Sequence, residues 1–420
     1  MKYTSQRGTR DILPDQIKVW QFIETTARRV FESYNYAEIR TPLFESTELF
    51  TRSVGETTDI VTKEMYTFED KGKRSITLRP EETAPVVRAC IENNLFGQGE
   101  LVKLYYIGPM FRYERPQAGR YRQFYQAGVE VFGSADPLVD VEMIELGVKF
   151  FKELGLKDLE VDINSVGCPD CRPKFQEALK KYFKDKAKSL CGDCQKRLSA
   201  NPLRILDCKD LKCQKSIESA PASVEYLCPA CKADFEKVTG YLKQFKIAFK
   251  INKRLVRGLD YYVRTTFEII SKSLGAQNAV CGGGRYDNLV KELGGKQTPA
   301  TGFAIGLDRL VLVLEEQKVK IPKDDRLNVY IVTMGEAAKT RGFEVLKSLR
   351  EMCVKADMSY QEKSLKSQMK AADKLGAEFV LIIGEDELKR DIFVIKNMDK
   401  QAQEEVKFTD LLAKFKLRSE

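Results

Sequence analysis

Residues 104–132 read LYYIGPMFRYERPQAGRYRQFYQAGVEVF, and this stretch decides how the region around it folds. Two runs rich in aromatic and aliphatic residues, 104–113 and 124–132, enclose a polar loop that contains several arginines. That pattern predicts an antiparallel hairpin with a long loop at 114–123. Arg112 stands at the end of the first run, where a guanidinium could grip a phosphate group with two hydrogen bonds.

Helical and strand-like patterns alternate on either side of this hairpin. Pro14 precedes a helical pattern that Asp15 can cap. The glycines at 282–284 predict a turn after a strand, and 302–310 predicts a strand that runs into a helix. The other predicted elements are helices at 15–34 and 137–154 and strands at 37–42, 65–68 and 75–79.

A change of pattern marks the last hundred residues. The proline and charges at 321–325 form the best candidate for a linker. Beyond it, strands and helices alternate, which predicts a small domain with a mostly parallel sheet. The predicted strands are 328–332 and 379–383, and the predicted helices are 336–355 and 364–375.

Length and composition exclude several classes of protein. A chain of 420 residues predicts two or three domains, and 43% hydrophobic with 31% charged residues is typical of a globular protein. No apolar run approaches the roughly 18 residues of a membrane span, and polar residues follow Met1. We therefore expect a cytoplasmic protein without a membrane partner. The chain contains no histidine, which excludes Ser-His-Asp triads, Cys-His pairs and histidine-ligated zinc sites.

Residues 168–245 interrupt the pattern and predict an insertion rich in cysteine and lysine. Eight cysteines lie in this insertion, and their paired spacing in a cytoplasmic chain is typical of structural zinc ligands. We expect 168/171 to pair with 191/194 and 208/213 with 228/231. An interleaved pairing, a single site, or reduced cysteines packed in a small core are the alternatives. The eight candidate ligands are Cys168, Cys171, Cys191, Cys194, Cys208, Cys213, Cys228 and Cys231.

The charge of the chain is concentrated in the same region. Residues 168–254 carry 20 Lys and Arg against 10 Asp and Glu, whereas the whole chain has a net charge of +9. This balance suits a polyanion such as RNA, although a solvated lysine-rich surface explains it equally well.

Two further arginines, Arg257 and Arg309, stand close to glycines in the sequence. Together with Arg112 they are candidate ligands of phosphate groups. The chain has no P-loop and no dinucleotide fingerprint, so phosphate contacts would depend on such arginines. Each of them alone is more often part of a surface ion pair.

Several longer motifs occur in an order that resembles the bacterial histidyl-tRNA synthetases, a family of class II aminoacyl-tRNA synthetases. The resemblance extends over essentially the whole chain. The motifs are RGTRD (7–11), the motif 1 strand at 37–42, TLRPEETA (77–84), FRYERPQ (111–117), LVRGLDYY (255–262), GGGRYD (282–287) and GFAIGLDRL (302–310), which resembles motif 3.

The resemblance implies an α+β fold in which a six- or seven-stranded antiparallel sheet is flanked by helices. It implies a catalytic core at 1–167 and 246–320, a helical insertion at 168–245 and a C-terminal α/β anticodon-binding domain at 326–420. It also implies a homodimer with the motif 1 helix and strand at the two-fold axis. The implied reaction is ligation of L-histidine to its tRNA through histidyl-adenylate, with ATP as substrate and Mg²⁺ as cofactor.

The same resemblance implies roles for individual residues. The catalytic charges would be Arg112 and Arg257 near the α-phosphate and Arg309 on the γ-phosphate. Phe124 would stack on adenine, with Glu114 and Arg120 near the nucleotide. The histidine amino and carboxylate groups would lie near Glu81, Thr83 and Gln126, and the imidazole near Glu130 and Tyr262. Arg112, Arg257 and Tyr261 would also belong to the histidine-binding residues.

Two other functions explain parts of the sequence. A non-catalytic paralogue that binds histidine and regulates its biosynthesis would share the core motifs, but such paralogues usually lack the anticodon-binding domain and alter the Arg257 motif. A zinc-stapled RNA-binding module would explain 168–254 but not the arginine motifs.

Overall fold

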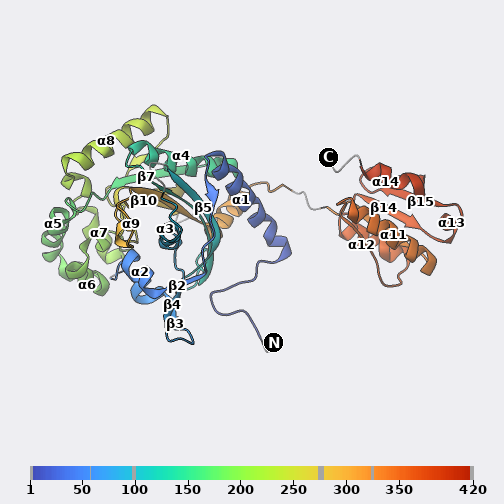
Figure 1. The fold of residues 1–420 in the computed structure, drawn as a ribbon, viewed down its shortest axis with the longest axis horizontal. Coiled ribbons are helices and arrows are strands. Elements are labelled where there is room, and N and C mark those ends of the chain that lie inside the picture. Colours follow the sequence, from blue (N-terminus) through green and yellow to red (C-terminus); the bar gives the residue numbers. More distant parts are fainter. Residues whose placement is uncertain (1–2, 57, 97–100, 273–278, 323–325, 417–420) are drawn as a thin grey trace. The chain divides into compact units, whose positions relative to one another are not determined.

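The computed structural model describes residues 3–56, 58–96, 101–272, 279–322 and 326–416 (Figure 1). The chain forms two compact units, Met1–Ile321 and Pro322–Glu420. Of the linker expected at 321–325, residues 323–325 lie outside the described residues. In the part of the chain that is described, no helix is long and apolar enough to cross a membrane.

An eight-stranded sheet, ordered β1-β5-β6-β11-β10-β9-β7-β8, forms the centre of the first unit. The predicted hairpin is confirmed as β5 and β6, which pair antiparallel with Val102 opposite Phe132. The inner pairs of strands are antiparallel. The edge strands β1 and β8, each two residues long, pair parallel with their neighbours and raise the number of strands above the expected six or seven. The strands are β1 (Ala37–Glu38), β5 (Val102–Phe111), β6 (Gln123–Phe132), β7 (Leu159–Ser165), β8 (Lys250–Ile251), β9 (Val263–Ser271), β10 (Ala279–Arg285) and β11 (Ala300–Gly306).

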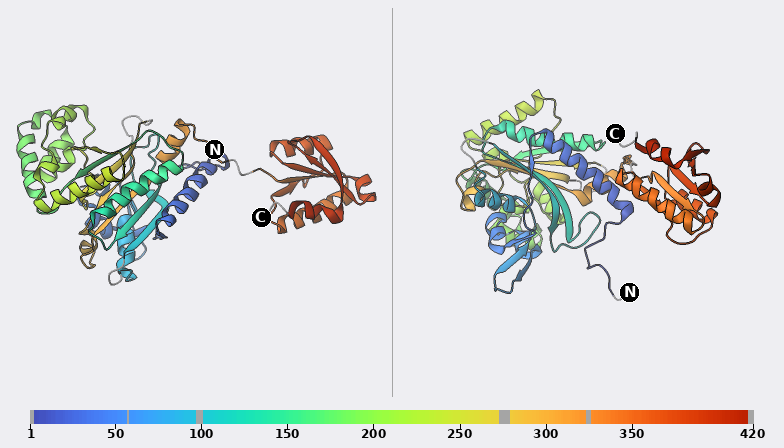
Figure 2. Two further views of the ribbon diagram at one scale, coloured as in Figure 1. Left: turned by 90° about the horizontal axis from the view of Figure 1, so that it is seen from above. Right: turned by 45° about the vertical axis from the view of Figure 1, so that its right-hand side comes forward.

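Helices α1 (Pro14–Ser33) and α4 (Pro137–Glu153) lie side by side over one face of this sheet (Figure 2). Because side chains of a strand alternate between its faces, β6 sends Val129 into the core under these helices and turns Gln126 toward the opposite face. The N-cap of α1 is Leu13, with Pro14 at its first position, so the expected cap at Asp15 is wrong.

Shorter elements complete the opposite face. A three-stranded sheet has the order β2-β4-β3, and its strands β3 and β4 confirm the pair predicted at 65–68 and 75–79. The elements are β2 (Phe44–Ser46), α2 (Thr47–Val54), the π-helix η1 (Ile60–Glu64), β3 (Tyr66–Glu69), β4 (Ser75–Leu78), α3 (Thr83–Glu92) and α9 (Leu289–Glu292). Helix α10 (Leu307–Glu316) instead packs Leu310 and Val313 into the core shared with α1 and α4.

The predicted insertion is helical and gathers at one end of the unit (Figure 1). Its own core includes Phe175, Leu179 and Ile217. Helix α8 instead packs Val238 and Leu242 into the core under the main sheet. The helices are α5 (Arg172–Lys184), α6 (Gly192–Ala200), α7 (Leu211–Glu218) and α8 (Pro229–Gln244), with 3-10 turns η2 (Ala187–Ser189), η3 (Pro202–Ile205) and η4 (Ser223–Tyr226).

The second unit holds a five-stranded sheet, ordered β13-β12-β14-β15-β16. The first three strands are parallel, but β15 and β16 form an antiparallel hairpin, so the expectation of a mostly parallel sheet is wrong. Strand β16 is almost wholly exposed and polar, which hides it from a hydrophobic pattern. The elements are β12 (Val329–Thr333), α11 (Glu336–Glu351), β13 (Ala356–Met358), α12 (Leu365–Lys374), β14 (Phe379–Ile383), α13 (Glu385–Lys389), β15 (Ile392–Asn397), β16 (Ala402–Lys407) and α14 (Phe408–Lys416).

Candidate functional site

A cavity of about 300 Å³ opens on the face of the main sheet away from α1 and α4. Its walls come from the start of α3, the β5–β6 hairpin, the segment 257–262, strands β9–β11 and the start of α10. It brings together eleven of the side chains singled out in the sequence, namely Glu81, Thr83, Arg112, Glu114, Arg120, Phe124, Gln126, Arg257, Tyr261, Tyr262 and Arg309.

Cationic side chains gather at one end of the cavity. The Nε of Arg112 donates to the Pro80 carbonyl at 2.8 Å, and its guanidinium lies 5.3 Å from the centre of the Phe124 ring. Arg309, on the first turn of α10, donates to the Ala279 carbonyl at 2.7 Å. Burial and the nearby charge of Arg120 lower the pKa of Arg309. An anion between these arginines would relieve that repulsion, so the end of the cavity suits a polyphosphate.

Arg257 lies against strand β10 and forms an ion pair with Glu268 of β9. Burial disfavours its charge, but Glu268 and Tyr262 raise the pKa of Arg257 above its ordinary value. A Cβ atom on Gly282 would lie only 2.2 Å from the Arg257 Nη2, so the strand needs glycine there. The turn expected at 282–284 is wrong: the glycines lie inside β10, where Gly282 makes room for the guanidinium and the other two lie against the neighbouring strands.

Buried hydrogen-bond acceptors also line the cavity. Glu81 accepts from the backbone N–H groups of Thr83 and Ala84 at 2.8 and 3.0 Å, and from the Tyr261 hydroxyl at 3.5 Å. Burial raises the pKa of Glu81. The Gln126 Oε1 is buried without a hydrogen-bond partner among the described residues. Because unpaired buried polar atoms are costly, the cavity is also suited to a ligand with hydrogen-bond donors.

Glu130 does not line the cavity. It lies behind Thr83, whose hydroxyl donates to the Glu130 Oε1 at 2.8 Å, and it also accepts from the Tyr286 hydroxyl. Burial raises the pKa of Glu130 to about 8. A Cβ atom on Gly302 would lie 2.0 Å from the Glu130 Oε2, so this carboxyl also depends on a glycine in the neighbouring strand.

Three residues of the site escape sequence reasoning. Glu268 reads as an ordinary polar position of an alternating strand, and nothing in its spacing marks it. Tyr286 stands inside the stretch 282–287, but its contact with Glu130 joins strands distant in sequence. Asp308 accepts from Arg10 at 2.9 Å and from the Tyr125 N–H at 2.8 Å, which ties the start of α10 to the hairpin.

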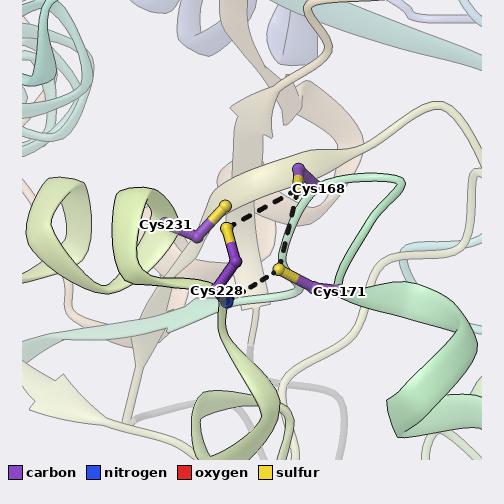
Figure 3. Close-up of side chains that lie close together, drawn as sticks. All are labelled: Cys168, Cys171, Cys228 and Cys231. Atoms are coloured by element: carbon purple, nitrogen blue, oxygen red, sulfur yellow. Dashed lines mark hydrogen bonds between the residues drawn. The ribbon is translucent and has the colours of Figure 1, made fainter.

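The eight cysteines of the insertion form two separate groups of four, with all sulfurs of a group within 4.8 Å of one another. We name them the outer tetrad (Cys168, Cys171, Cys228 and Cys231; Figure 3) and the inner tetrad (Cys191, Cys194, Cys208 and Cys213). The expected pairing of 168/171 with 191/194 is wrong. The outer tetrad joins the two ends of the insertion, because the chain leaves the main sheet after β7 and returns through α8 at the same place.

The tetrads fit tetrahedral zinc. Four thiolates about 2.3 Å from zinc lie about 3.8 Å apart. The Cys168 Sγ is 3.6 Å from that of Cys171 and 3.9 Å from that of Cys228, and the Cys191 and Cys208 sulfurs are 3.8 Å apart. Backbone N–H groups also donate to sulfur in each tetrad, at 3.1 Å to Cys171 and 3.2 Å to Cys213. Such donors favour the thiolate that a metal requires.

Comparisons with known proteins agree with this architecture. The family profile described as Histidyl-tRNA synthetase matches residues 8–310, and the one described as Anticodon binding domain matches residues 328–418. A histidine–tRNA ligase of Halothermothrix orenii is 53% identical over 412 residues, which cover 98% of each chain.

Solved structures extend the comparison. The crystal structure of apo histidyl-tRNA synthetase from S. aureus matches with a TM-score of 0.84 at 41% identity and covers 99% of this chain and 100% of that one. A Bacillus halodurans chain described as an ATP phosphoribosyltransferase regulatory subunit/histidyl-tRNA synthetase matches with a TM-score of 0.65 at 21% identity, covering 91% and 99%, and shares the fold. By full-length identity, by profile and by fold, the chain belongs to the histidyl-tRNA synthetase family.

Proposed function

We propose that the cavity of the first unit is the active site in which this enzyme activates histidine. The enzyme ligates histidine to its tRNA, and its family uses ATP with Mg²⁺. One observation carries the assignment of the site: a single cavity is lined both by the arginines Arg112, Arg257 and Arg309 and by the buried acceptors Glu81 and Gln126. A polyphosphate and a zwitterionic amino acid would meet in this cavity.

The arginines support the first step of the reaction. The carboxylate of histidine attacks the α-phosphorus of ATP; a carboxylate oxygen–phosphorus bond forms, the bond to the bridging oxygen breaks, and pyrophosphate leaves. We assign Arg112 and Arg257 to the α-phosphate and Arg309 to the γ-phosphate, because fixed charges stabilise the negative charge that develops there. Phe124 would stack on adenine, with Arg120 beside the phosphates.

Mg²⁺ would neutralise charge on the leaving pyrophosphate. It is usually held by one or two carboxylates together with substrate phosphates. Glu114 lines the cavity beside Arg120, with their side chains 3.2 Å apart, and is the carboxylate that we assign to it.

The buried acceptors support recognition of the amino acid. Glu81 would pair with the ammonium group, and Thr83 and Gln126 would bond the polar groups beside it. Tyr261 and Tyr262, with ring centres 4.7 Å apart, would contact the imidazole. Glu130 would set the polarity of this part of the cavity through Thr83, which it holds. A buried site of this kind discriminates strongly against side chains that cannot form its hydrogen bonds.

ATP–pyrophosphate exchange with each amino acid in turn tests the proposal. We expect exchange with histidine and a strong loss of it in Glu81→Gln. Exchange with another amino acid, or none, would contradict the assignment. The regulatory alternative loses support because a ligase shares 53% of its residues with this chain, whereas the regulatory-type chain shares 21%.

The remaining parts would serve tRNA. We assign residues 326–420 to anticodon binding, supported by the profile match at 328–418, and 1–167 with 246–320 to catalysis. The insertion at 168–245 would place its positive charge against the acceptor arm, with an affinity that falls steeply with salt. Ligation of this kind would take place in the cytoplasm.

A homodimer is supported by exposed apolar side chains near the motif 1 strand. Leu43, Phe44 and Phe68 are exposed in the small sheet and the segment before it. Patches of this kind commonly mark protein–protein contacts. Sedimentation of the purified enzyme tests its oligomeric state, and an active enzyme that is strictly monomeric would contradict the proposed homodimer.

Each tetrad would hold one structural zinc ion. Four protein ligands leave no open position, so the metal would stabilise the fold without taking part in the reaction. Elemental analysis of protein purified without chelator should find about two zinc ions per chain, one for each group of four thiolates. A content near zero, with a melting temperature that chelation does not change, would leave only reduced cysteines in a small core.

A further inference from the structure

The segment 257–262 carries three side chains of the proposed histidine and ATP site, Arg257, Tyr261 and Tyr262. It forms neither helix nor strand. Its backbone therefore lacks the regular hydrogen bonds that would hold these side chains in place. Contacts between this segment and the rest of the protein therefore also position the three side chains in the site.

Contacts from the insertion hold this segment at Asp260. The Asp260 Oδ1 accepts from the Arg204 Nη2 at 2.9 Å and from the Asn201 Nδ2 at 3.2 Å. Arg172 donates to two backbone carbonyls of the segment, that of Asp260 at 3.2 Å and that of Tyr262. At Asp260 the core contributes the bond from its N–H to the Val54 carbonyl at 3.1 Å; elsewhere in the segment, Arg257 pairs with Glu268 and Tyr261 donates to Glu81.

These contacts are shielded from solvent. In the ion pair, the side chain of Arg204 is 12% exposed and that of Asp260 is 31% exposed, and Arg172 is half-buried. A partly desolvated ion pair with further hydrogen bonds is more rigid and more costly to break than an exposed one.

All three donors lie in segments that begin or end at cysteines of the tetrads. Arg172 directly follows Cys171 of the outer tetrad, and Asn201 and Arg204 lie between Cys194 and Cys208 of the inner one. Among the residues of α6, all of which are described, only Cys194 is buried. Outside the inner tetrad, the helix is held by the Arg197–Asp59 ion pair at 2.5 Å, by Gln195, which donates to the Ala187 and Leu190 carbonyls, and by partly buried Leu198. Cys194 is its one fully buried anchor, so the inner tetrad contributes strongly to its position.

We propose that Arg172, Asn201 and Arg204 are positioning residues for histidine recognition, and that the metal-bound tetrads hold them, so that metal occupancy sets the affinity of the enzyme for histidine. This inference rests on the proposed function of the cavity. The tetrads would then do more than stabilise the insertion. Their loss would also lower the affinity of the cavity for histidine.

Arg204→Met tests the first half, because it keeps the bulk of the side chain and removes the charge and donors. In pyrophosphate exchange we expect the KM for histidine to rise about tenfold, as loss of an orienting hydrogen bond commonly does, with the KM for ATP within about twofold. Arg204→Lys should recover part of the effect. The matched control is Lys196→Met, at an exposed residue of the same insertion, which should leave both constants unchanged.

Cys194→Ser tests the second half, in the full-length enzyme, with zinc content measured in parallel. We expect a loss of about one zinc ion per chain and a rise in the histidine KM similar to that of Arg204→Met. Because both changes act through one contact, the double variant should show far less than the product of the two effects. If Cys194→Ser fails to fold, zinc removal from the parent and from Arg204→Met by chelation gives the same comparison.

The outcomes separate this inference from the function on which it rests. An unchanged histidine KM in Arg204→Met, or independent effects of Arg204 and the metal, would overturn the inference while histidine-dependent exchange of the parent upholds the site. A parent without histidine-dependent exchange would overturn the proposed function itself.

Discussion

Arg257→Ala is the most informative change within the proposed active site. The guanidinium lies on the glycine backbone of β10, is 19% exposed, and pairs with Glu268. In the role proposed for Arg257, alanine would remove a charge that is already fixed where negative charge develops on the α-phosphate. A preorganised donor of this kind is worth about 100-fold or more in rate, or about 2.7 kcal/mol or more of barrier.

The fold should tolerate the change. The partner Glu268 is 23% exposed and can be hydrated when it loses its cation. We therefore expect kcat for pyrophosphate exchange to fall about 100-fold, with a thermal unfolding midpoint close to that of the parent. Arg264→Ala is the matched control, since Arg264 pairs with Asp234 at 2.8 Å but does not line the cavity. Near-normal exchange in Arg257→Ala would refute the role of this charge.

Three further predictions concern other parts of the molecule. Deletion of 326–420 should spare adenylate formation but greatly weaken charging of tRNA, because the anticodon contacts are lost; full charging by the truncated enzyme would contradict the domain assignment. Burial raises the pKa of Glu130 to about 8, so the native state keeps a proton that the unfolded chain loses, and the free energy of unfolding should fall as pH rises from the ordinary carboxyl range to about 8. In urea titrations Glu130→Gln should flatten that fall, although Glu82, whose pKa burial also raises to about 8, leaves part of it; an unchanged slope would contradict the shift. Phe44→Asp should shift the sedimenting species toward monomer if the small sheet lies at the dimer interface, and an unchanged mass would exclude that location.

The elements that could be predicted are those with strong local patterns. The hairpin of β5 and β6 follows from two apolar runs around a polar loop, and α4 from an uninterrupted helical period. Strand β16 could not be predicted in the same way, because its exposed edge position leaves it with the composition of a loop. The glycines of β10 resemble a turn, because the groups that require them, the Arg257 guanidinium at Gly282 and the neighbouring strands at the other two, come together only in the fold.

The site divides in a similar way. Arg112, Arg257 and Arg309 stand in recognisable motifs, and the cavity collects them. The partner of Arg257, the place of Glu130 behind Thr83 and the pairing of the cysteines depend on long-range packing. Spacing along the chain favours neighbouring CxxC pairs, whereas the fold joins the first pair with the last, because the insertion begins and ends at one place on the sheet.

A single-turnover experiment tests the central claim most directly. The full-length enzyme is mixed with ATP labelled at the α-phosphate, with histidine and with pyrophosphatase, the bound adenylate is counted, and cognate tRNA is then added. We predict about one histidyl-adenylate for each active site, followed by transfer of the histidine to tRNA and release of AMP. Enzyme that binds histidine but forms no adenylate, or holds an adenylate that tRNA does not consume, would contradict the account.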